Sequence, residues 1–544
     1  MSDDPRDAAA AAPTELPESV EGRSREIYEE WRAATSPAER DRLQVKFLKG
    51  HPFVQAKEPT IYEFAKHRAE VSGFRLHVYK FRKWLNSKKG YPYKRAAGGM
   101  SDDGLYTVSP MLRELMPRGL HRVTLTPVDS KTSATTVLFR GIPKFSGLVA
   151  CDEDEESNAS ASIFFYDGAS LKDAGGFYVT AKSNGENAKM GCLVADGVPY
   201  LLAGSKNTCY IWPAEDPYSK HGEANNPKVP AQFICLLYSH FYLNLTAEQK
   251  REFVELMTTK YGTIMGEINT PWYEHVVPIN DLFMETYTLL DARGRPVHPK
   301  TSFDFFKHFG IDQRFKTISV PPPEKSGVPS PDKLQEFYET KSQIKMAEAG
   351  YPLDAKQPYV NHVYFSSHSI QDLDGVINSI RDAKNTEGAV LYLTDAKSDR
   401  VIGLVKVKAS EYVLRRRIRE NLKGALFSKL SRGEVKEFPV RERENNKVQK
   451  KEKSPAKILP LKSHVRIVKD RIHKGARALT HVPGCKEHWE EWAAFGRGFA
   501  EWWVSSRLLN GTNPEQINID YVLKEAKGRI ASLFAAYASL NSKK

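Results

Sequence analysis

The stretch Gly175–Gly204, GGFYVTAKSNGENAKMGCLVADGVPYLLAG, decides the fold class of this chain. Short runs of β-branched, aromatic and aliphatic residues are separated by the pairs Asn184-Gly185 and Asp196-Gly197. Asn-Gly and Asp-Gly pairs between such runs are typical of turns that join β-strands. The stretch therefore predicts three strands of antiparallel sheets, and Lys182 ends the first of them.

The same strand pattern extends outward on both sides of this stretch. Its further examples are HRVTLTPVD, ATTVLFRGI, ASIFFYDG, TCYIWP and TIMGEIN, followed later in the chain by NHVYFSS, GAVLYLT and VIGLVKVKA. Runs of this kind that are bounded by Gly, Asn and Asp predict additional strands.

Helical spacing of apolar residues surrounds and interrupts the strands. It occurs in Ser24–Trp31, Pro37–Leu48, Thr60–Trp84, Leu245–Tyr261, Ser369–Ala383 and Tyr521–Leu540, and in the aromatic stripe Trp489, Trp492, Phe495, Phe499 and Trp502. We expect the stripe to be buried because large rings drive burial, and stacking on nucleic-acid bases is the alternative. The patterns together predict an α+β fold.

Length and composition divide this fold into five segments. At roughly 150 residues per domain, 544 residues are enough for about three structural units. The predicted segments are a disordered tail (1–23), a helical N-terminal region (24–104), a domain of antiparallel sheets (105–425), a basic flexible segment (426–465) and a helical C-terminal domain (466–544).

The composition argues against membrane and secreted proteins. No part of the chain approaches the ~18 consecutive apolar residues of a membrane span. The five cysteines contain no C-x-x-C pair, and the acidic, alanine-rich start lacks the apolar core of a secretory signal. We therefore expect an intracellular protein, cytoplasmic or nuclear, without membrane association.

Positive charge is concentrated in one part of the chain. The whole chain has a net charge of +13, while Arg415–Arg477 alone holds 21 Lys and Arg against 7 Asp and Glu. Side chains that displace counterions from phosphates give strong, salt-sensitive binding, so this segment favours a polyanion as partner. A solvated linker with a nuclear address is the alternative.

Lys182 is the first candidate for chemistry. A lysine acts as a nucleophile only if neighbouring cations or burial lower its pKa from about 10.4 toward neutrality. We expect the turn at Asn184 and Gly185 to adopt positive φ and to let the backbone approach a nucleotide closely. An ordinary hairpin is the alternative interpretation of K-x-N-G.

Other charged residues surround Lys182 in a fixed order along the chain. They are Arg140 and Lys144 in FRGIPKF, Lys206 in GSKNT, Glu267 in GEIN, Glu387 in TEGAVLYL, and Lys406 and Lys408 in VKVKASEY. Because Lys406 and Lys408 alternate with valines, a strand would present both ammonium groups on one face. Two parallel ammonium groups suit a phosphate.

This order resembles the covalent nucleotidyltransferases, which include polynucleotide ligases and mRNA capping enzymes. The motif I lysine of that family would be Lys182, the glutamates of motifs III and IV would be Glu267 and Glu387, and the paired lysines of motif V would be Lys406 and Lys408. FRGIPKF, GSKNT and the helical segment before TEGAVLYL are most similar to phage RNA ligase 1 and the ligase domain of fungal tRNA ligase.

The resemblance implies a fold, a reaction and a set of binding residues. Residues 105–425 would be an adenylyltransferase domain whose sheets flank a nucleotide cleft, and the protein would seal RNA ends with ATP and magnesium, or manganese in its place, through lysyl-AMP. Lys182, Lys406, Lys408 and Glu387 would be catalytic, and Glu387 would hold the metal. The nucleotide would be bound by these four residues together with Asn184, Gly185, Arg140, Lys144, Lys206 and Glu267.

Two features of the sequence narrow this implied role in RNA repair and processing. No G-x-x-x-x-G-K-[ST] loop occurs, so a polynucleotide kinase module is not predicted and the RNA ends would be prepared by other proteins. The residues after Tyr412 have the pattern of a basic loop and helices, whereas capping enzymes and DNA ligases usually append an OB-fold there.

Two further functions remain as alternatives. One is a capping guanylyltransferase or a DNA ligase, which use the same lysine chemistry. The other is a non-catalytic nucleic-acid-binding protein on a ligase scaffold, in which the basic Arg415–Arg477 segment binds the nucleic acid. Retention of all the motif lysines and glutamates favours the catalytic reading.

Overall fold

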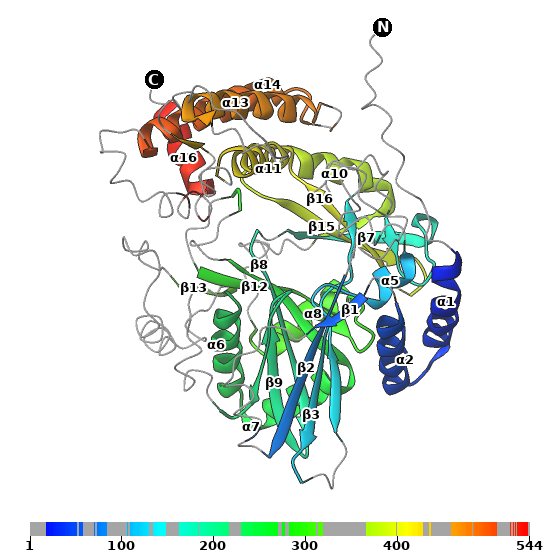
Figure 1. Ribbon diagram of the computed structural model, residues 1–544. Coiled ribbons are helices and arrows are strands. Elements are labelled where there is room, and N and C mark those ends of the chain that lie inside the picture. Colours follow the sequence, from blue (N-terminus) through cyan, green and yellow to red (C-terminus); the bar gives the residue numbers. More distant parts are fainter. Residues whose placement is uncertain are drawn as a thin grey trace, which may run out of the picture.

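In this computed structural model, three larger β-sheets are surrounded by helices (Figure 1). The residues that the structure describes are 18–51, 54–57, 70, 73–83, 106, 109–129, 134–147, 163–182, 184–216, 230–269, 275–277, 282–311, 314–318, 366–398, 400–427, 435–436, 459–480, 482, 484–508, 523, 526, 528 and 530–541. The mixture of helices and mainly antiparallel sheets confirms the predicted α+β class. Residues 1–17 of the predicted tail and most of the basic segment lie outside the described residues. The predicted disorder is wrong for residues 18–23, which form the start of a helix.

Two N-terminal helices begin the described chain. α1 spans Glu18–Ala33 and α2 spans Pro37–Gly50. The Ser36 side chain accepts a hydrogen bond from the backbone N–H of Glu39, and a proline occupies the first turn of α2. Both features favour a helix start. The apolar faces of the two helices pack together with α5 (Pro110–Leu115).

A four-stranded N-terminal sheet follows these helices. In spatial order it contains β1 (Val54–Lys57), β2 (Phe74–Lys83), β3 (His121–Pro127) and β4 (Thr135–Phe139). All neighbouring pairs in this sheet are antiparallel.

The helix predicted over Thr60–Trp84 is wrong at β2. The alternating residues Phe74, Leu76 and Val78 are buried in a core shared with Leu193, Tyr200 and Leu202 of a second sheet, while the residues between them are exposed. The four-residue spacing of Phe74 and Val78 fits a helix as well as a strand, so periodicity left the choice open. Pairing with β3 along the whole strand decides it.

A six-stranded sheet with helices on one face, the helix-backed sheet, holds the largest core. Its strands in spatial order are β10 (Cys209–Pro213), β9 (Val198–Gly204), β8 (Glu186–Ala195), β11 (Tyr261–Asn269), β12 (Leu282–Asp291) and β13 (Arg314–Ile318). The packed helices are α6 (Pro230–Leu243), α7 (Ala247–Thr259) and α8 (Pro299–His308). α7 confirms the helix predicted after Leu245.

The third sheet, the β16 sheet, packs on the other face of the helix-backed sheet. It contains β14 (Ser366–Ser369), β7 (Ala174–Ala181), β15 (Gly388–Asp395), β16 (Val401–Lys408) and β5 (Ser146–Gly147), and β6 (Phe164–Phe165) also pairs with β16. Tyr392 and Leu404 contribute to the core between the two sheets, together with Met265 of β11. α10 (Leu373–Asp382) covers the outer face (Figure 1).

The stretch Gly175–Gly204 connects these two sheets. β8 and β9 form a hairpin whose turn residues Asp196 and Gly197 have φ values of 48° and 74°. β7, in contrast, lies in the β16 sheet, so the chain crosses from one sheet to the other at Asn184-Gly185. The hairpin interpretation of this turn is therefore wrong, and Lys182 lies at the crossing.

The C-terminal helices pack on α11 (Ser410–Leu422), which follows β16 directly. They are α13 (Leu461–Arg477), α14 (Trp489–Trp503) and α16 (Ile530–Asn541) (Figure 1). The aromatic stripe of α14 joins the core of this bundle: Phe499 is fully buried and its ring lies 4.5 Å from that of Phe534 on α16. Phe499 is thus buried as predicted, while the other four rings of the stripe are half-buried against the helices of the same bundle. Among the described helices, none is long and apolar enough to cross a lipid bilayer.

Candidate active site

The Lys182 side chain lies where the β16 sheet and the helix-backed sheet meet. Lys182 follows β7, and its backbone N–H donates to the carbonyl of Gly388 at 2.9 Å, which places it beside the start of β15. Its Nζ forms an ion pair with Glu387 Oε1 at 2.9 Å, and the two side chains are 18% and 7% exposed. The predicted nucleophile and the predicted motif IV glutamate are therefore in direct contact.

The crossing after Lys182 is held by hydrogen bonds to two other segments. The Gly185 N–H donates to Glu267 Oε2 at 3.0 Å, and Asn184 Nδ2 donates to the Val277 carbonyl at 3.1 Å. A Cβ on Gly185 would collide with the carbonyl of Ile268. The expected positive φ is wrong for Gly185, which does not have it. Glycine is required here by the close approach to β11.

Two carboxylates flank Lys182 and differ in charge state. Burial raises the pKa of Glu267 to about 8; Lys182 opposes this rise, and Glu387 and the cross-strand neighbour Glu285 add to it. Burial also acts to raise the pKa of Glu387, but Lys182 and Lys408 together hold it below its ordinary value. At neutral pH the site thus contains one largely protonated and one ionised glutamate.

The two lysines of β16 are buried on the face toward the helix-backed sheet. Lys406 and Lys408 are 7% and 2% exposed, while Val405 and Val407 pack in the core beneath α10. This alternation is the predicted one. Arg381 of α10 donates to the Lys408 carbonyl at 2.7 Å and anchors the end of the strand. The ammonium group of Lys408 acts electrostatically on Glu387.

Lys206 lies in the turn between β9 and β10, and its side chain is exposed. Its charge acts on Glu186, whose pKa is raised by burial and lowered by Lys206. Glu186 directly follows the Asn184-Gly185 crossing. Lys206 is therefore located at the edge of the site, close to Glu186, which follows the crossing.

Arg140 and Lys144 have different surroundings from Lys182. The Arg140 guanidinium bonds to Asp41 and to Gln44 Oε1 of α2, the latter at 2.9 Å. Lys144 lines a separate cavity between α1, α5 and the edge of the β16 sheet. The N-terminal helices, which the sequence did not connect with FRGIPKF, supply these contacts.

His275 is a site residue that the sequence analysis missed. It lies in the loop after β11, with Nε2 3.9 Å from Glu186 Oε1 and Nδ1 3.3 Å from Arg419 Nη1 of α11. Burial and then Arg419 lower the pKa of His275 to about 4, and Glu387, Lys182 and Arg416 also act on it. The three-residue spacing of Arg416 and Arg419 on a helix directly after Lys408 was the signal available in the sequence.

Tyr287 of β12 is a second missed residue. Burial, and then the charges of Glu267 and Tyr392, raise the pKa of its hydroxyl well above the ordinary value. The residue packs at the edge of the core between the two sheets. An aromatic ring therefore lies close to Glu267, on the strand that pairs with β11.

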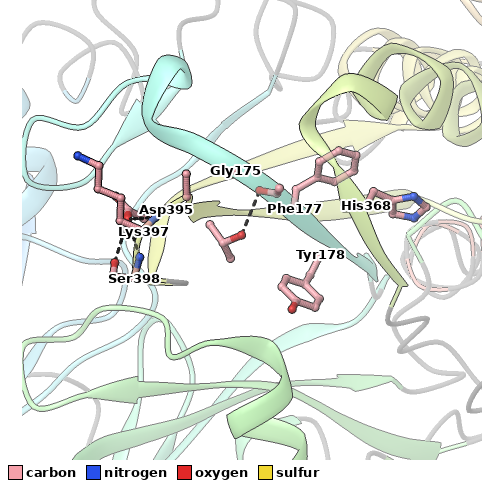
Figure 2. A pocket seen from close by; sticks show the side chains of 10 residues that line it. Gly175, Phe177, Tyr178, His368, Asp395, Lys397 and Ser398 are labelled. Carbon is pink, nitrogen blue, oxygen red and sulfur yellow. Dashed lines mark hydrogen bonds between the residues drawn. The ribbon is translucent and has the colours of Figure 1, made fainter.

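A pocket of about 550 Å³ opens at the opposite end of β7 from Lys182 (Figure 2). Its Asp395 carboxylate accepts hydrogen bonds from the N–H groups of Lys397 and Ser398 and from the Ser398 hydroxyl. The Phe177 ring stacks on His368 at 5.3 Å. Because these groups bond to one another and none belongs to the predicted site, we assign no chemistry to this pocket.

No protein-family model matches the sequence, and no curated protein matches it. A solved structure titled "Archaeal ATP-dependent RNA ligase - form 1" is similar over 72% of this chain and 74% of its own length, with 13% sequence identity and a TM-score of 0.32. A similarity of this size carries no argument, so the chemistry that follows rests on the side chains themselves.

Proposed function

We propose that this chain is an ATP-dependent RNA ligase that stores AMP on Lys182 and seals 5′-phosphate and 3′-hydroxyl RNA ends. The observation that carries the proposal is the contact between Lys182 and Glu387, beside which lie Lys408 and the uncharged Glu267. These side chains come from separate strands and strand ends of two sheets. An ion pair with a purely structural role would need only Lys182 and Glu387. The presence of Lys408 and Glu267 beside them therefore favours a catalytic role.

In the first step, the neutral Lys182 Nζ attacks the α-phosphorus of ATP. A P–N bond forms, the bond to diphosphate breaks, and Nζ loses a proton. Lys408 and Lys406 place fixed positive charge where the phosphoryl oxygens gain negative charge, which is the most effective way to lower such a barrier.

Glu267 is suited to the ribose of the nucleotide. With a pKa of about 8 its carboxyl group is largely protonated at neutral pH, so it both donates and accepts hydrogen bonds. A sugar hydroxyl has the same two capacities. Asn184, Gly185 and Lys206 would border the nucleotide, and the Tyr287 ring would supply an apolar surface beside Glu267.

A magnesium ion fits this site with Glu387 as its protein ligand. Mg²⁺ is usually held by one or two carboxylates together with substrate phosphates and water. Glu387 is ionised, and among the described residues no group of three or more His, Cys, Asp or Glu side chains forms a complete protein cage. Such an ion would neutralise phosphate charge when ATP is bound.

The later steps use the same lysines and an RNA end. A 5′-phosphate oxygen attacks the phosphorus of lysyl-AMP, the P–N bond breaks and Lys182 is released as an amine. A 3′-hydroxyl then attacks the activated 5′-phosphate, a phosphodiester forms and AMP leaves. Arg416 and Arg419 of α11, on the side of His275, provide positive charge for the incoming strand.

The test is covalent labelling of the full-length protein. We expect α-labelled ATP with magnesium to give acid-labile label on the chain, and Lys182→Ala to abolish it, whereas Lys172→Ala at an exposed lysine serves as the matched control. An unlabelled wild type, or label that survives Lys182→Ala, would contradict the proposal. Label from GTP alone would instead indicate a capping guanylyltransferase, and sealing of DNA but not RNA would indicate a DNA ligase.

A further inference from the structure

A charged cavity of about 200 Å³ lies between α1, α5, the segment before β5 and the residues from β6 to Gly168, and Lys182 is not part of its lining. β6 pairs with Gly403 and Leu404 near the start of β16, and Lys408 ends that strand. The residues that line the cavity include none of the five proposed for the α-phosphate position, which are Lys182, Glu267, Glu387, Lys406 and Lys408.

The two carboxylates that line the cavity are already paired. Glu114 accepts hydrogen bonds from Tyr28 and Arg295, one on each oxygen. Asp167 pairs with Arg295 at 2.9 Å and with Arg400 at 3.4 Å. The negative charges of the lining are thus neutralised by residues that do not depend on a bound ligand.

The positively charged side chains of the lining are Arg32, Arg113 and Lys144. The Arg113 guanidinium stacks 3.8 Å from the centre of the Phe164 ring. Burial lowers its pKa, with Glu114 opposing. Arg113 is half-buried, and a guanidinium in such a lining binds an anion through its N–H groups.

An unsatisfied hydroxyl lies in the same wall. Tyr166 is 6% exposed, and within the described residues its Oη has no hydrogen-bond partner. A buried hydroxyl in this state costs about 1–3 kcal/mol. Arg295, which stacks on the Tyr166 ring at 4.6 Å, also has a buried nitrogen, Nη1, without a partner. Of these two groups, the Tyr166 hydroxyl belongs to a residue that lines the cavity.

We propose that this cavity binds a phosphate group, with Arg113 and the Tyr166 hydroxyl as its principal donors. A planar guanidinium and a hydroxyl match the oxygens of a phosphate. The volume exceeds that of several waters at ~30 Å³ each and falls below the roughly 300 Å³ at which small-molecule sites begin. The ligand is therefore a free phosphate or diphosphate, or one backbone phosphate of RNA, and not a whole nucleotide.

The test compares three probes on the full-length protein by thermal unfolding: inorganic phosphate, inorganic diphosphate, and an RNA oligonucleotide with hydroxyl groups at both ends. At about 100-fold above half-saturation, we expect a binding probe to raise Tm by about 2 °C relative to sodium chloride of equal ionic strength. Arg113→Gln should raise the half-saturating concentration roughly tenfold or more. Arg75→Gln removes an exposed arginine of β2 and should not change it.

Tyr166→Phe removes the hydroxyl and is expected to keep the fold. It therefore tests phosphate binding by the cavity even if Arg113→Gln does not fold. It should weaken the response to the same probe. A response to the free anions assigns the site to phosphate or diphosphate, and a response to the oligonucleotide alone assigns it to the RNA backbone. If no probe distinguishes Arg113→Gln or Tyr166→Phe from Arg75→Gln, the proposal is wrong. Labelling of Lys182 is measured separately and does not enter this result.

Discussion

At the scale of single residues, the ion pair between Lys182 and Glu387 is the feature most open to measurement. Both side chains are largely buried, so removing one leaves the other charge without its partner. We expect Glu387→Gln to lower the free energy of unfolding at pH 7 by about 1–3 kcal/mol, near the lower value because Lys182 is 18% exposed. Self-adenylylation should be lost.

A double-mutant cycle separates the pair from its surroundings. Lys182→Met combined with Glu387→Gln should destabilise the protein by about 1 kcal/mol less than the sum of the single changes. Denaturant unfolding of the four proteins gives this coupling. Strict additivity would mean that the two side chains do not interact in solution.

The protonation of Glu267 predicts a pH dependence of stability. Burial raises its pKa from about 4.5 in the unfolded chain to about 8, so between these pH values the folded state binds one more proton. The free energy of unfolding therefore falls as pH rises from 5 to 8, by up to about 1.4 kcal/mol per pH unit from this group. Glu267→Gln should make the decline shallower by that amount.

The matched control for this prediction is Glu248→Gln, on the exposed first turn of α7. Its unfolding free energy should follow the wild-type pH profile. A Glu267→Gln profile parallel to the wild type between pH 5 and 8 would place the carboxyl group in solvent with an ordinary pKa.

At the scale of elements, we expect the lysines of β16 to determine whether the site binds a phosphate group. Lys408→Met keeps most of the buried volume and removes the ammonium group that acts on Glu387. We expect self-adenylylation to slow by about 10²–10³-fold, as when one preorganised donor to a charged transition state is removed. Circular dichroism should show an intact fold. Lys397→Met, in the exposed turn before β16, is the control, and an equal rate in both variants would exclude the phosphate role.

The elements also show where sequence patterns are sufficient. Lys406 and Lys408 alternate with Val405 and Val407 at the two-residue period of a β-strand. This alternation predicts both the strand and the residues on each of its faces. The spacing of apolar residues within Phe74–Lys83 fits both a helix and a strand. Only the pairing of this segment with β3 shows that it is a strand. Asn184-Gly185 has the composition of a hairpin turn. The strands on its two sides nevertheless join different sheets, because each pairs with strands that are distant in the sequence.

At the scale of the whole molecule, the long-range contacts of the charged residues join segments with no common pattern. Arg140 of FRGIPKF bonds to α2, and His275 connects a loop after β11 to α11. Such contacts depend on how the sheets and helices pack, which no local periodicity encodes. The resemblance carried by the order of charged residues named Lys182 and Glu387 as candidates, whereas His275, Arg416, Arg419 and Tyr287 are found only from the packing.

The C-terminal bundle determines how RNA binding can be tested. Ile472 of α13 and Trp503 of α14 share a core with Ile418 of α11, directly after the β16 lysines. Deleting the chain after Arg443 would expose this core, so loss of sealing would not identify an RNA contact. Substitutions on the exposed surface of α13 avoid this problem.

Charge removal on α13 is the sharper experiment. Its exposed cations are Arg466, Arg471, Lys474 and Arg477, and changing all four to Gln leaves the buried residues unchanged. If they contact the RNA backbone, the slope of log K against log salt should fall by about 3, since each phosphate contact with single strands contributes about 0.7. Self-adenylylation should be unaffected.

The control removes four exposed cations from the helix-backed sheet region, Arg251, Lys260, Lys300 and Lys307. Equal slopes for the two variants would make α13 a solvated surface, and RNA binding would then rest on the residues around Lys182.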